Sequence, residues 1–186
     1  VSTGSDLQVF DLDALAHHLD RFVAMLHDEH AEFDTPGPVA SRDFFNGWMD
    51  TLVKGYGKPA QWVISLGSYG YDWTDGKETG EQISFADAMS RAGRSAQTTC
   101  TFHLPSFNPH FSYEEGTVRH SVWFLDAVTF LNQLTAARSH RAAGIAVNRL
   151  GTEDPGIWEV LASFPSGKQR LEDLVRLEPI PASTLI

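Results

Sequence analysis

The sequence predicts an α/β fold in which a parallel sheet is built from buried strands joined by crossover helices. Short apolar runs, of the kind that form strands buried on both faces, alternate along the chain with segments whose apolar residues recur at helical spacing. A stretch from Gly67 to about Trp123 is rich in Gly, Pro, Tyr and Asp and interrupts this alternation. With 42% hydrophobic and 20% charged residues, the 186-residue chain has the composition of a globular domain with a buried core.

The amino-terminal part predicts a helix, a strand, a helix and a second strand. Asp11 to Leu19 has apolar residues on one helical face, and Asp11 is a suitable N-cap. Arg21 to His27 is an apolar run bounded by charge, which suits a buried strand. The next helix is predicted from Ser41, its cap, to about Tyr56, and Ala60 to Leu66 is the next buried strand.

The interruption that follows is interpreted as an inserted α+β unit, at about residues 68–123. It contains one short amphipathic helix, one strand and one hairpin across Glu115-Gly116. These are Phe85 to Ala92, Thr98 to Leu104, and Phe111 to Tyr113 paired with Val118 to Trp123.

After the insertion the alternation resumes. Asp126 to Arg141 has helical spacing and a basic last turn, and Ala142 to Val147 is a third buried strand. Asp154 and Pro155 begin a final helix as N-cap and first residue. We therefore expect one domain over residues 1–164 and a linker or tail towards another module over residues 165–186.

Charge and composition exclude several classes of function. Twenty-four acidic against fourteen basic residues give a net charge of −10, which would repel a nucleic acid backbone. The apolar runs are too short for a membrane helix, and no cofactor is expected. The single Cys100 is predicted to be a small buried residue, because it can form neither a disulfide within the chain nor a Cys-based zinc site.

Five segments stand out when they are read in order: Met25 to His30, Gly37 to Ser41, Leu66 to Trp73, Val122 to Ala127 and Gly144 to Gly151. Together they resemble the second half of family 18 glycoside hydrolase barrels, particularly the branch related to spore-cortex hydrolases and to bacterial proteins that fuse such a barrel to polysaccharide deacetylase and glycosyltransferase modules. The resemblance covers about residues 6 to 160.

The resemblance implies a partial TIM (β/α)8 barrel. Phe22 to His27 corresponds to strand six, Trp62 to Gly67 to strand seven and Ile145 to Arg149 to strand eight, with the small α+β insertion between strands seven and eight. The end of strand five is at best represented near Val1. A closed barrel needs eight strands in about 250 residues, so the amino-terminal half of the barrel is an expected partner of this chain.

Polar and aromatic residues follow each of the three strands, where barrels of this type bind their ligands. The expected substrate-binding residues are Met25, His27, Asp28, Glu29, Tyr69, Tyr71, Asp72, Trp73, Asn148 and Arg149. In the resembled family a Met-x-Tyr-Asp arrangement after strand six helps to hold the substrate N-acetyl group, and here His27 replaces the Tyr. A Trp normally ends strand eight beneath the sugar, and here the residue is Asn148.

The general acid of the family is the Glu of Asp-x-x-Asp-x-Asp-x-Glu on strand four, and no segment of this sequence matches that pattern. The isolated chain is therefore predicted to be inactive. The full-length protein is expected to bind or hydrolyse β-linked N-acetylhexosamine polymers such as chitin, peptidoglycan or exopolysaccharide, at the cell envelope or in an extracytoplasmic location. The alternative is a non-catalytic carbohydrate-binding or scaffold barrel in a multidomain polysaccharide-processing protein.

Several residues have competing interpretations. His27, Asp28 and His30 could instead belong to a metal-dependent hydrolase, although no metal site is predicted. Gly67 to Trp73 could be a sugar platform or a packed turn that anchors the insertion. Arg149 could donate to a ligand hydroxyl or pair with Asp154 or Glu153, and the pair is slightly favoured. Two further groups are expected to have no role in the site. They are the core tryptophans Trp48, Trp62 and Trp158, and the surface or rim histidines His103, His110 and His120.

Overall fold

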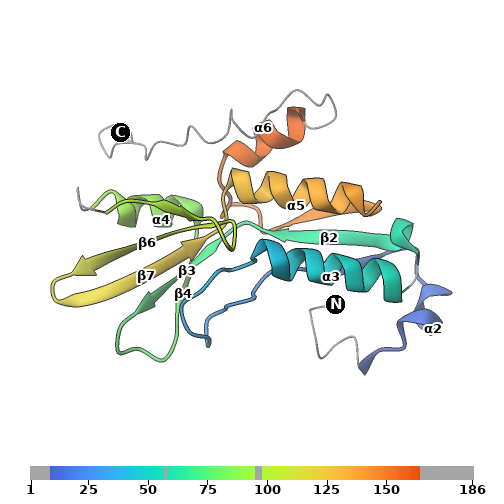
Figure 1. Cartoon of the computed structure of the whole chain (residues 1–186), viewed down its shortest axis with the longest axis horizontal. Helices are drawn as coiled ribbons and strands as arrows, with labels where there is room; N and C mark the ends of the chain where they lie inside the picture. Colours follow the sequence, from blue (N-terminus) through green and yellow to red (C-terminus); the bar gives the residue numbers. More distant parts are fainter. Residues whose placement is uncertain (1–8, 57, 95–97, 164–186) are drawn as a thin grey trace.

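The chain folds around two sheets that are joined end to end (Figure 1). The computed structural model describes residues 9–56, 58–94 and 98–163. A three-stranded parallel sheet lies at one end, with helices packed on it, and a five-stranded antiparallel sheet with a single helix lies at the other. The expected end of strand five near Val1 and the tail over residues 165–186 lie outside the described residues.

The parallel sheet confirms the predicted alternation of strands and helices. Its strands are β1 (Phe22–Met25), β2 (Trp62–Gly67) and β8 (Gly144–Asn148), in the order β1-β2-β8. Ile64 in the central strand lies opposite Ala24 on one side and Ile145 on the other. Because all three strands are parallel, their carboxyl ends lie at one edge, next to the insertion.

One face of this sheet is covered by helices. Alternate strand residues, among them Ala24, Leu26, Ile64 and Leu66, are buried there together with apolar residues of the helices. The helices are α2 (Leu12–Ala16), α3 (Arg42–Gly55), α5 (Ala127–Ser139) and α6 (Gly156–Ser163), and the short 3-10 helix η1 (Pro59–Gln61) precedes β2. The intervening strand residues face the opposite side, where Val23 is 45% exposed, and this side corresponds to the interior of a closed barrel.

Two helices begin at their predicted caps, Asp11 and Ser41, and a third begins after Asp126, which caps it in the same way. The side chain of Asp11 accepts the Ala14 N–H at 2.9 Å, and Ser41 Oγ accepts the Phe44 N–H at 3.2 Å. Asp126 accepts the Thr129 N–H at 2.8 Å. A helix N-terminus leaves backbone donors without partners, and these short polar side chains satisfy one of them at each start.

The insertion is an antiparallel sheet with one covered face. Its strands are β3 (Gly70–Thr74), β4 (Glu81–Ile83), β5 (Thr101–His103), β6 (Asn108–Glu115) and β7 (Val118–Phe124), in the order β4-β3-β7-β6-β5. The helix α4 (Phe85–Ala92) covers one face, and Ser84 and Asp87 cap it reciprocally. The predicted helix and hairpin are confirmed, but β3 and β4 were not expected. β3 pairs with β7, about fifty residues away, and this long-range pairing overrides a local sequence rich in glycine and aspartate.

Three core and surface predictions need correction. Trp62 is buried and Trp48 packs against the core, but Trp158 is 45% exposed because Ile157 and Val160 form the buried side of α6. His120 was expected at the surface and is buried. Cys100 is only half-buried, against the insertion core, and burial raises the pKa of its thiol to about 11.

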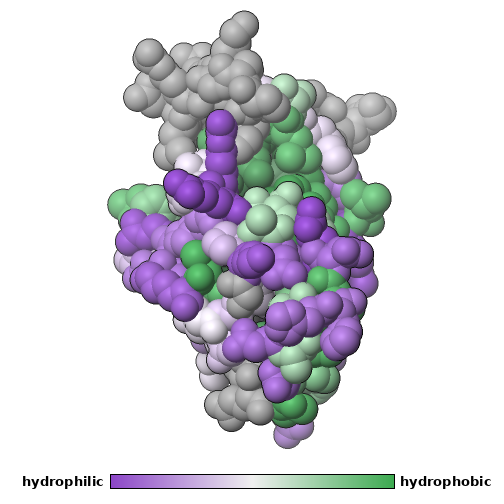
Figure 2. Space-filling model, turned by 90° about the vertical axis from the view of Figure 1, so that its right-hand side faces the viewer, coloured by the Kyte–Doolittle hydropathy of each residue, from purple (hydrophilic) through white to green (hydrophobic). Residues whose placement is uncertain are grey.

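The end of the molecule remote from the insertion has a mixed surface. Figure 2 shows hydrophilic side chains across much of this end, with hydrophobic groups in separate patches. None of the described helices is long and apolar enough to cross a membrane. The carboxyl edge of the parallel sheet lies next to the insertion and contains the polar contacts described next.

Candidate functional site

The carboxyl edge of the parallel sheet brings together residues that are far apart in the sequence. His27 and Asp28 follow β1, and Tyr69 lies between β2 and β3. Tyr71 is the second residue of β3, and its side chain turns back towards Asp28. These four residues are called the Asp28 cluster below.

Asp28 is the centre of this cluster. Its Oδ1 accepts hydrogen bonds from the Tyr69 hydroxyl at 2.6 Å and from the Tyr71 hydroxyl at 3.0 Å. Its Oδ2 lies 3.0 Å from His27 Nδ1, which also lies 2.8 Å from the Tyr69 hydroxyl. Asp28 has a φ of 64°, a left-handed conformation that Asp adopts more readily than most residues, and this turn places its carboxylate among the three partners.

The cluster has a defined charge state near neutral pH. Burial opposes ionisation of Asp28, but hydrogen bonds from His27 and the two tyrosine hydroxyls together hold the pKa of its carboxyl below the ordinary value. Burial, and secondly the Asp28 carboxylate, raise the pKa of Tyr69 and of Tyr71 well above the usual range. Asp28 is thus an ionised acceptor held by protonated tyrosines, and its side chain remains 36% exposed to a ligand.

A line of polar contacts connects this cluster to the end of β8. The Gln82 amide donates to the Tyr71 hydroxyl at 3.4 Å, and the Arg149 guanidinium donates to Gln82 Oε1 at 2.7 Å. The predicted pairing of Arg149 with Asp154 or Glu153 is therefore wrong. The Asp154 carboxylate accepts the Ala127 and Gly156 N–H groups, and Glu153 accepts the Gly151 N–H. Nothing in the local sequence of β4 marked Gln82 as part of this line.

Met25 and Asn148 lie at the same edge. Met25 is the last residue of β1 and is half-buried. Asn148 is the last residue of β8, where it pairs with Gly67, and its carbonyl accepts the Ser68 N–H at 2.8 Å. The Glu29 carboxylate is engaged elsewhere, because it accepts the Ser41 N–H at 2.7 Å beside the start of α3.

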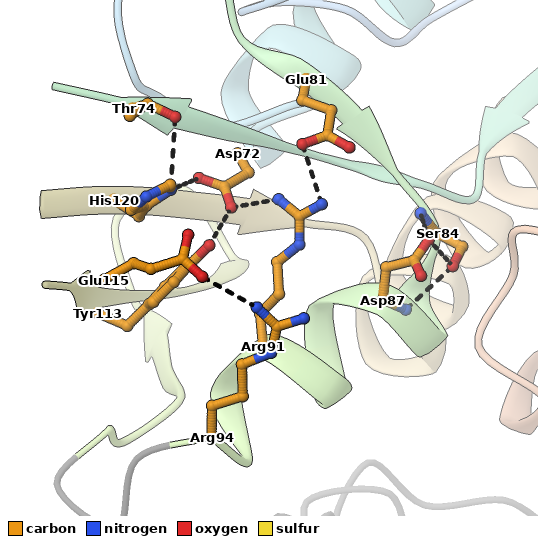
Figure 3. Close-up of polar contacts among 10 residues, drawn as sticks. All are labelled: Asp72, Thr74, Glu81, Ser84, Asp87, Arg91, Arg94, Tyr113, Glu115 and His120. Atoms are coloured by element: carbon orange, nitrogen blue, oxygen red, sulfur yellow. Dashed lines mark hydrogen bonds and ion pairs between the residues drawn. The ribbon is translucent and has the colours of Figure 1, made fainter. Parts of the chain in front are cut away.

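Asp72 lies on the face of β3 opposite to that of Tyr71, and Figure 3 shows its contacts. Its carboxylate is 1% exposed and accepts hydrogen bonds from the Arg91 guanidinium, the Tyr113 hydroxyl at 2.7 Å and His120 Nδ1 at 2.9 Å. These four residues are called the Asp72 cluster. Successive side chains of a strand point to opposite faces, and this separates Asp72 from Tyr71 although both were predicted to bind ligand.

Trp73 shares the face of Tyr71, with ring centroids 5.5 Å apart. It is 5% exposed, and its Nε1 has no hydrogen-bond partner among the described residues. Tyr69, Tyr71 and Trp73 pack with Val39 and Leu125 in a small apolar core, so the interpretation as an anchoring segment describes Trp73 well. Tyr69 and Tyr71 combine both roles, because their rings are buried while their hydroxyls reach Asp28.

His120 and Tyr113 were not recognised from the sequence as interacting residues. They are directly opposite one another on β6 and β7, with rings stacked at 4.4 Å. The register of the predicted hairpin could have identified this pair, because a tight turn fixes which residues face each other.

The metal-dependent alternative requires at least three ligands. His30 Nδ1 is directed to the Thr35 carbonyl at 2.8 Å rather than towards Asp28. Over the part of the chain that the structure describes, no group of three or more His, Cys, Asp or Glu side chains could hold a metal ion. The set of His27, Asp28 and His30 therefore does not form the site that this alternative needs.

Three neighbouring parallel strands, helices on their outer face and an α+β insertion after the second strand form part of a (β/α)8 barrel. Comparison with solved structures agrees with this assignment of the fold. The chitinase of Chromobacterium violaceum superposes with a TM-score of 0.76 at 25% identity, over 87% of this chain and 50% of that one. The Bacillus cereus spore cortex-lytic enzyme SleL gives a TM-score of 0.72 at 23% identity, over 82% of this chain and 36% of that one.

Sequence relatives are of the same kind. The uncharacterized glycosylase YvbX of Bacillus subtilis is 24% identical over 153 residues, which cover 82% of this chain and 44% of that protein. No protein-family model matches the chain. The relatives and structural neighbours are glycosylases and chitinases of the family 18 type, and the chain spans less than half the length of the curated relatives it matches.

Proposed function

We propose that this chain is the carboxyl-terminal, carbohydrate-binding part of a glycoside hydrolase-like barrel that acts on β-linked N-acetylhexosamine polymers. The Asp28 cluster is the observation that carries the proposal. An ionised carboxylate is held by two tyrosines and a histidine at the carboxyl edge of a parallel sheet, which is where barrels of this fold bind their ligands.

The chemistry of the cluster suits a neutral polyhydroxylated ligand. The partly exposed Asp28 carboxylate can accept hydrogen bonds from sugar hydroxyls, and the exposed Arg149 guanidinium can donate to sugar oxygens. The proposed ligand-binding set is Met25, His27, Asp28, Tyr69, Tyr71, Gln82, Asn148 and Arg149. Glu29, Asp72 and Trp73 are left out, because their contacts are internal to the fold.

We further propose that the general acid lies outside this chain, on another part of the same barrel, and that the isolated chain does not hydrolyse glycosidic bonds. Val23 of β1 is 45% exposed on the side of the sheet that corresponds to the barrel interior, which suits packing against further parts of a barrel. Fusion to deacetylase and glycosyltransferase modules belongs to the same proposal. So does an extracytoplasmic or cell-envelope location, which is favoured by the likeness to a spore cortex-lytic enzyme.

A non-catalytic scaffold is the second candidate. Two departures from the family pattern favour it, namely His27 in place of Tyr and Asn148 in place of Trp. Upstream sequence separates the two candidates, because a Glu at the end of strand four supports a hydrolase and its absence supports a scaffold.

Calorimetric titration with the tetramer of β-1,4-linked N-acetylglucosamine tests the binding proposal. We expect saturable binding, and we expect Asp28→Asn to weaken it at least about tenfold, because the substitution removes the charged acceptor. Glu114→Gln is the matched control, since Glu114 is an exposed carboxylate of the insertion, and it should leave the affinity unchanged. The β-1,4-linked glucose tetramer, which lacks the acetamido group, should bind more weakly. Equal affinity of Asp28→Asn and the native protein would contradict the proposal.

A further inference from the structure

His27 contains a buried nitrogen that nothing described in the structure satisfies. Its side chain is 5% exposed, and Nε2 has no hydrogen-bond partner among the described residues. Nearly all buried polar atoms in folded proteins are paired, so an unpaired one at a candidate ligand site indicates a missing partner. The other ring nitrogen, Nδ1, is fully engaged with Asp28 and Tyr69.

The surrounding groups determine where the imidazole proton lies. The Asp28 carboxylate can only accept, so Nδ1, at 3.0 Å from its Oδ2, must be the donor. The Tyr69 hydroxyl donates its own hydrogen to Asp28 Oδ1, so its oxygen also accepts from Nδ1. In the neutral imidazole Nε2 therefore has a free lone pair and is a hydrogen-bond acceptor.

The position of the ring places this acceptor on the ligand side of the sheet. His27 follows Val23 and Met25 in the alternation that faces away from the helices. Gly67, at the end of the neighbouring strand, makes room for it, because a Cβ added there would lie 3.1 Å from His27 Cβ and 2.8 Å from Leu125 Cδ1.

We infer that His27 Nε2 accepts a hydrogen bond from the ligand, so that the site selects a sugar that presents a hydroxyl or amide N–H donor at this point. The inference rests on the proposed function. A tyrosine at this position, as in the resembled family, can donate its hydroxyl proton to the ligand. Neutral His27 presents only the lone pair of Nε2 to the ligand. Binding at this point is therefore specific to donors and is lost when Nε2 gains a proton.

Two substitutions separate the roles of the two ring nitrogens. In His27→Asn the side-chain amide can replace Nδ1 as donor to Asp28, but no atom replaces Nε2. In His27→Gln the amide reaches the Nε2 position and can again present an oxygen acceptor. We expect the N-acetylglucosamine tetramer to bind about tenfold more weakly to His27→Asn, the loss of about one hydrogen bond, and within about threefold of native affinity to His27→Gln. His18→Asn, at an exposed histidine, is the matched control and should bind as the native protein does.

Imidazole ¹⁵N NMR provides a readout that a merely structural role would not change. In the ligand-free protein at pH 7.5 we expect the His27 signals of an Nδ1-protonated ring with a free Nε2, and the Nε2 signal should shift when the tetramer binds.

These experiments distinguish failure of the inference about His27 from failure of the proposed function. Tight binding by His27→Asn, or an Nε2 that already accepts a hydrogen bond in the ligand-free protein, overturns the inference and leaves the proposed function standing. Failure of the native protein to bind the tetramer at any pH refutes the proposed function together with the inference.

Discussion

The Asp28 cluster and the Asp72 cluster have similar compositions and opposite characters. Each has an aspartate held by tyrosine and histidine, and the two aspartates lie on either side of the boundary between the parallel sheet and the insertion. Asp72 is 1% exposed and has an arginine to neutralise it, whereas the Asp28 side chain is 36% exposed and has no arginine or lysine within its cluster. A closed, neutralised set of contacts is typical of a structural role, and an open one leaves capacity for a ligand.

The strongest test of this difference is Asp72→Ala. The substitution leaves Arg91 and the Tyr113 hydroxyl without their buried acceptor and leaves His120 Nδ1 only its 3.4 Å contact with the Thr74 hydroxyl, so we expect a loss of about 3–5 kcal/mol in the free energy of unfolding. Urea denaturation followed by tryptophan fluorescence measures it. A loss below about 1 kcal/mol would show that the Asp72 cluster is not a structural centre.

A further buried carboxylate, that of Asp126, extends the comparison to the pH dependence of stability. Burial, and to a smaller extent Asp154, raise the pKa of Asp126 to about 6, against 3.8 for the unperturbed group. Because the folded state then holds its proton more tightly, this group costs stability above pH 6, and the cost disappears as the pH falls towards 3.8. Asp126→Asn keeps an N-cap acceptor for Thr129 and removes the charge.

We expect Asp126→Asn to be more stable than the native protein by about 2–3 kcal/mol at pH 8, with the difference vanishing near pH 4. Denaturation midpoints of both proteins, measured between pH 4 and pH 8, test this expected difference. Asp126→Ala, which removes both the charge and the cap, should show a smaller gain. A difference between Asp126→Asn and the native protein that does not depend on pH would contradict the assignment.

The contribution of Asp28 to stability should depend on pH in the opposite direction to that of Asp126. Its folded-state pKa is lowered, so its contribution to stability is present above the unfolded-state pKa of 3.8 and is lost as the pH falls through the lower folded-state value. Asp28→Asn should therefore be less stable than the native protein at pH 7, by about 1 kcal/mol in view of the partial exposure, and the two should converge in acid. The same denaturation series measures both carboxylates, and a gap that widens in acid would refute this sign.

Much of the fold could be predicted from the sequence because the signals are local. The caps at Asp11 and Ser41 and the apolar run of β2 each specify an element from adjacent residues. β3 and β4 could not be predicted in this way, because β3 gains its stability from pairing with β7, a partner distant in sequence.

The candidate site was predictable only in part, for a related reason. Residues directly after β1 and β2 were correctly expected at one edge, because parallel strands end together. The division between Tyr71 and Asp72 depends on β3 being a strand, since only then do neighbouring side chains face opposite ways. Gln82 enters through the pairing of β4 with β3, for which the sequence has no local signal.

The smallest expected effect concerns the outer limit of the Asp72 cluster. Glu81 pairs with Arg91 at 3.0 Å, but its side chain is 67% exposed, so solvent screens most of the attraction. We expect Glu81→Gln to change the free energy of unfolding by less than about 0.5 kcal/mol, in contrast to Asp72→Ala, although both substitutions remove a carboxylate from the same arginine. The comparison uses identical denaturation conditions at low and high salt, and Glu114→Gln is the control for loss of one surface charge. If Glu81→Gln were as damaging as Asp72→Ala, the stability of this region would come from the net charge around Arg91 rather than from the buried hydrogen bonds of Asp72.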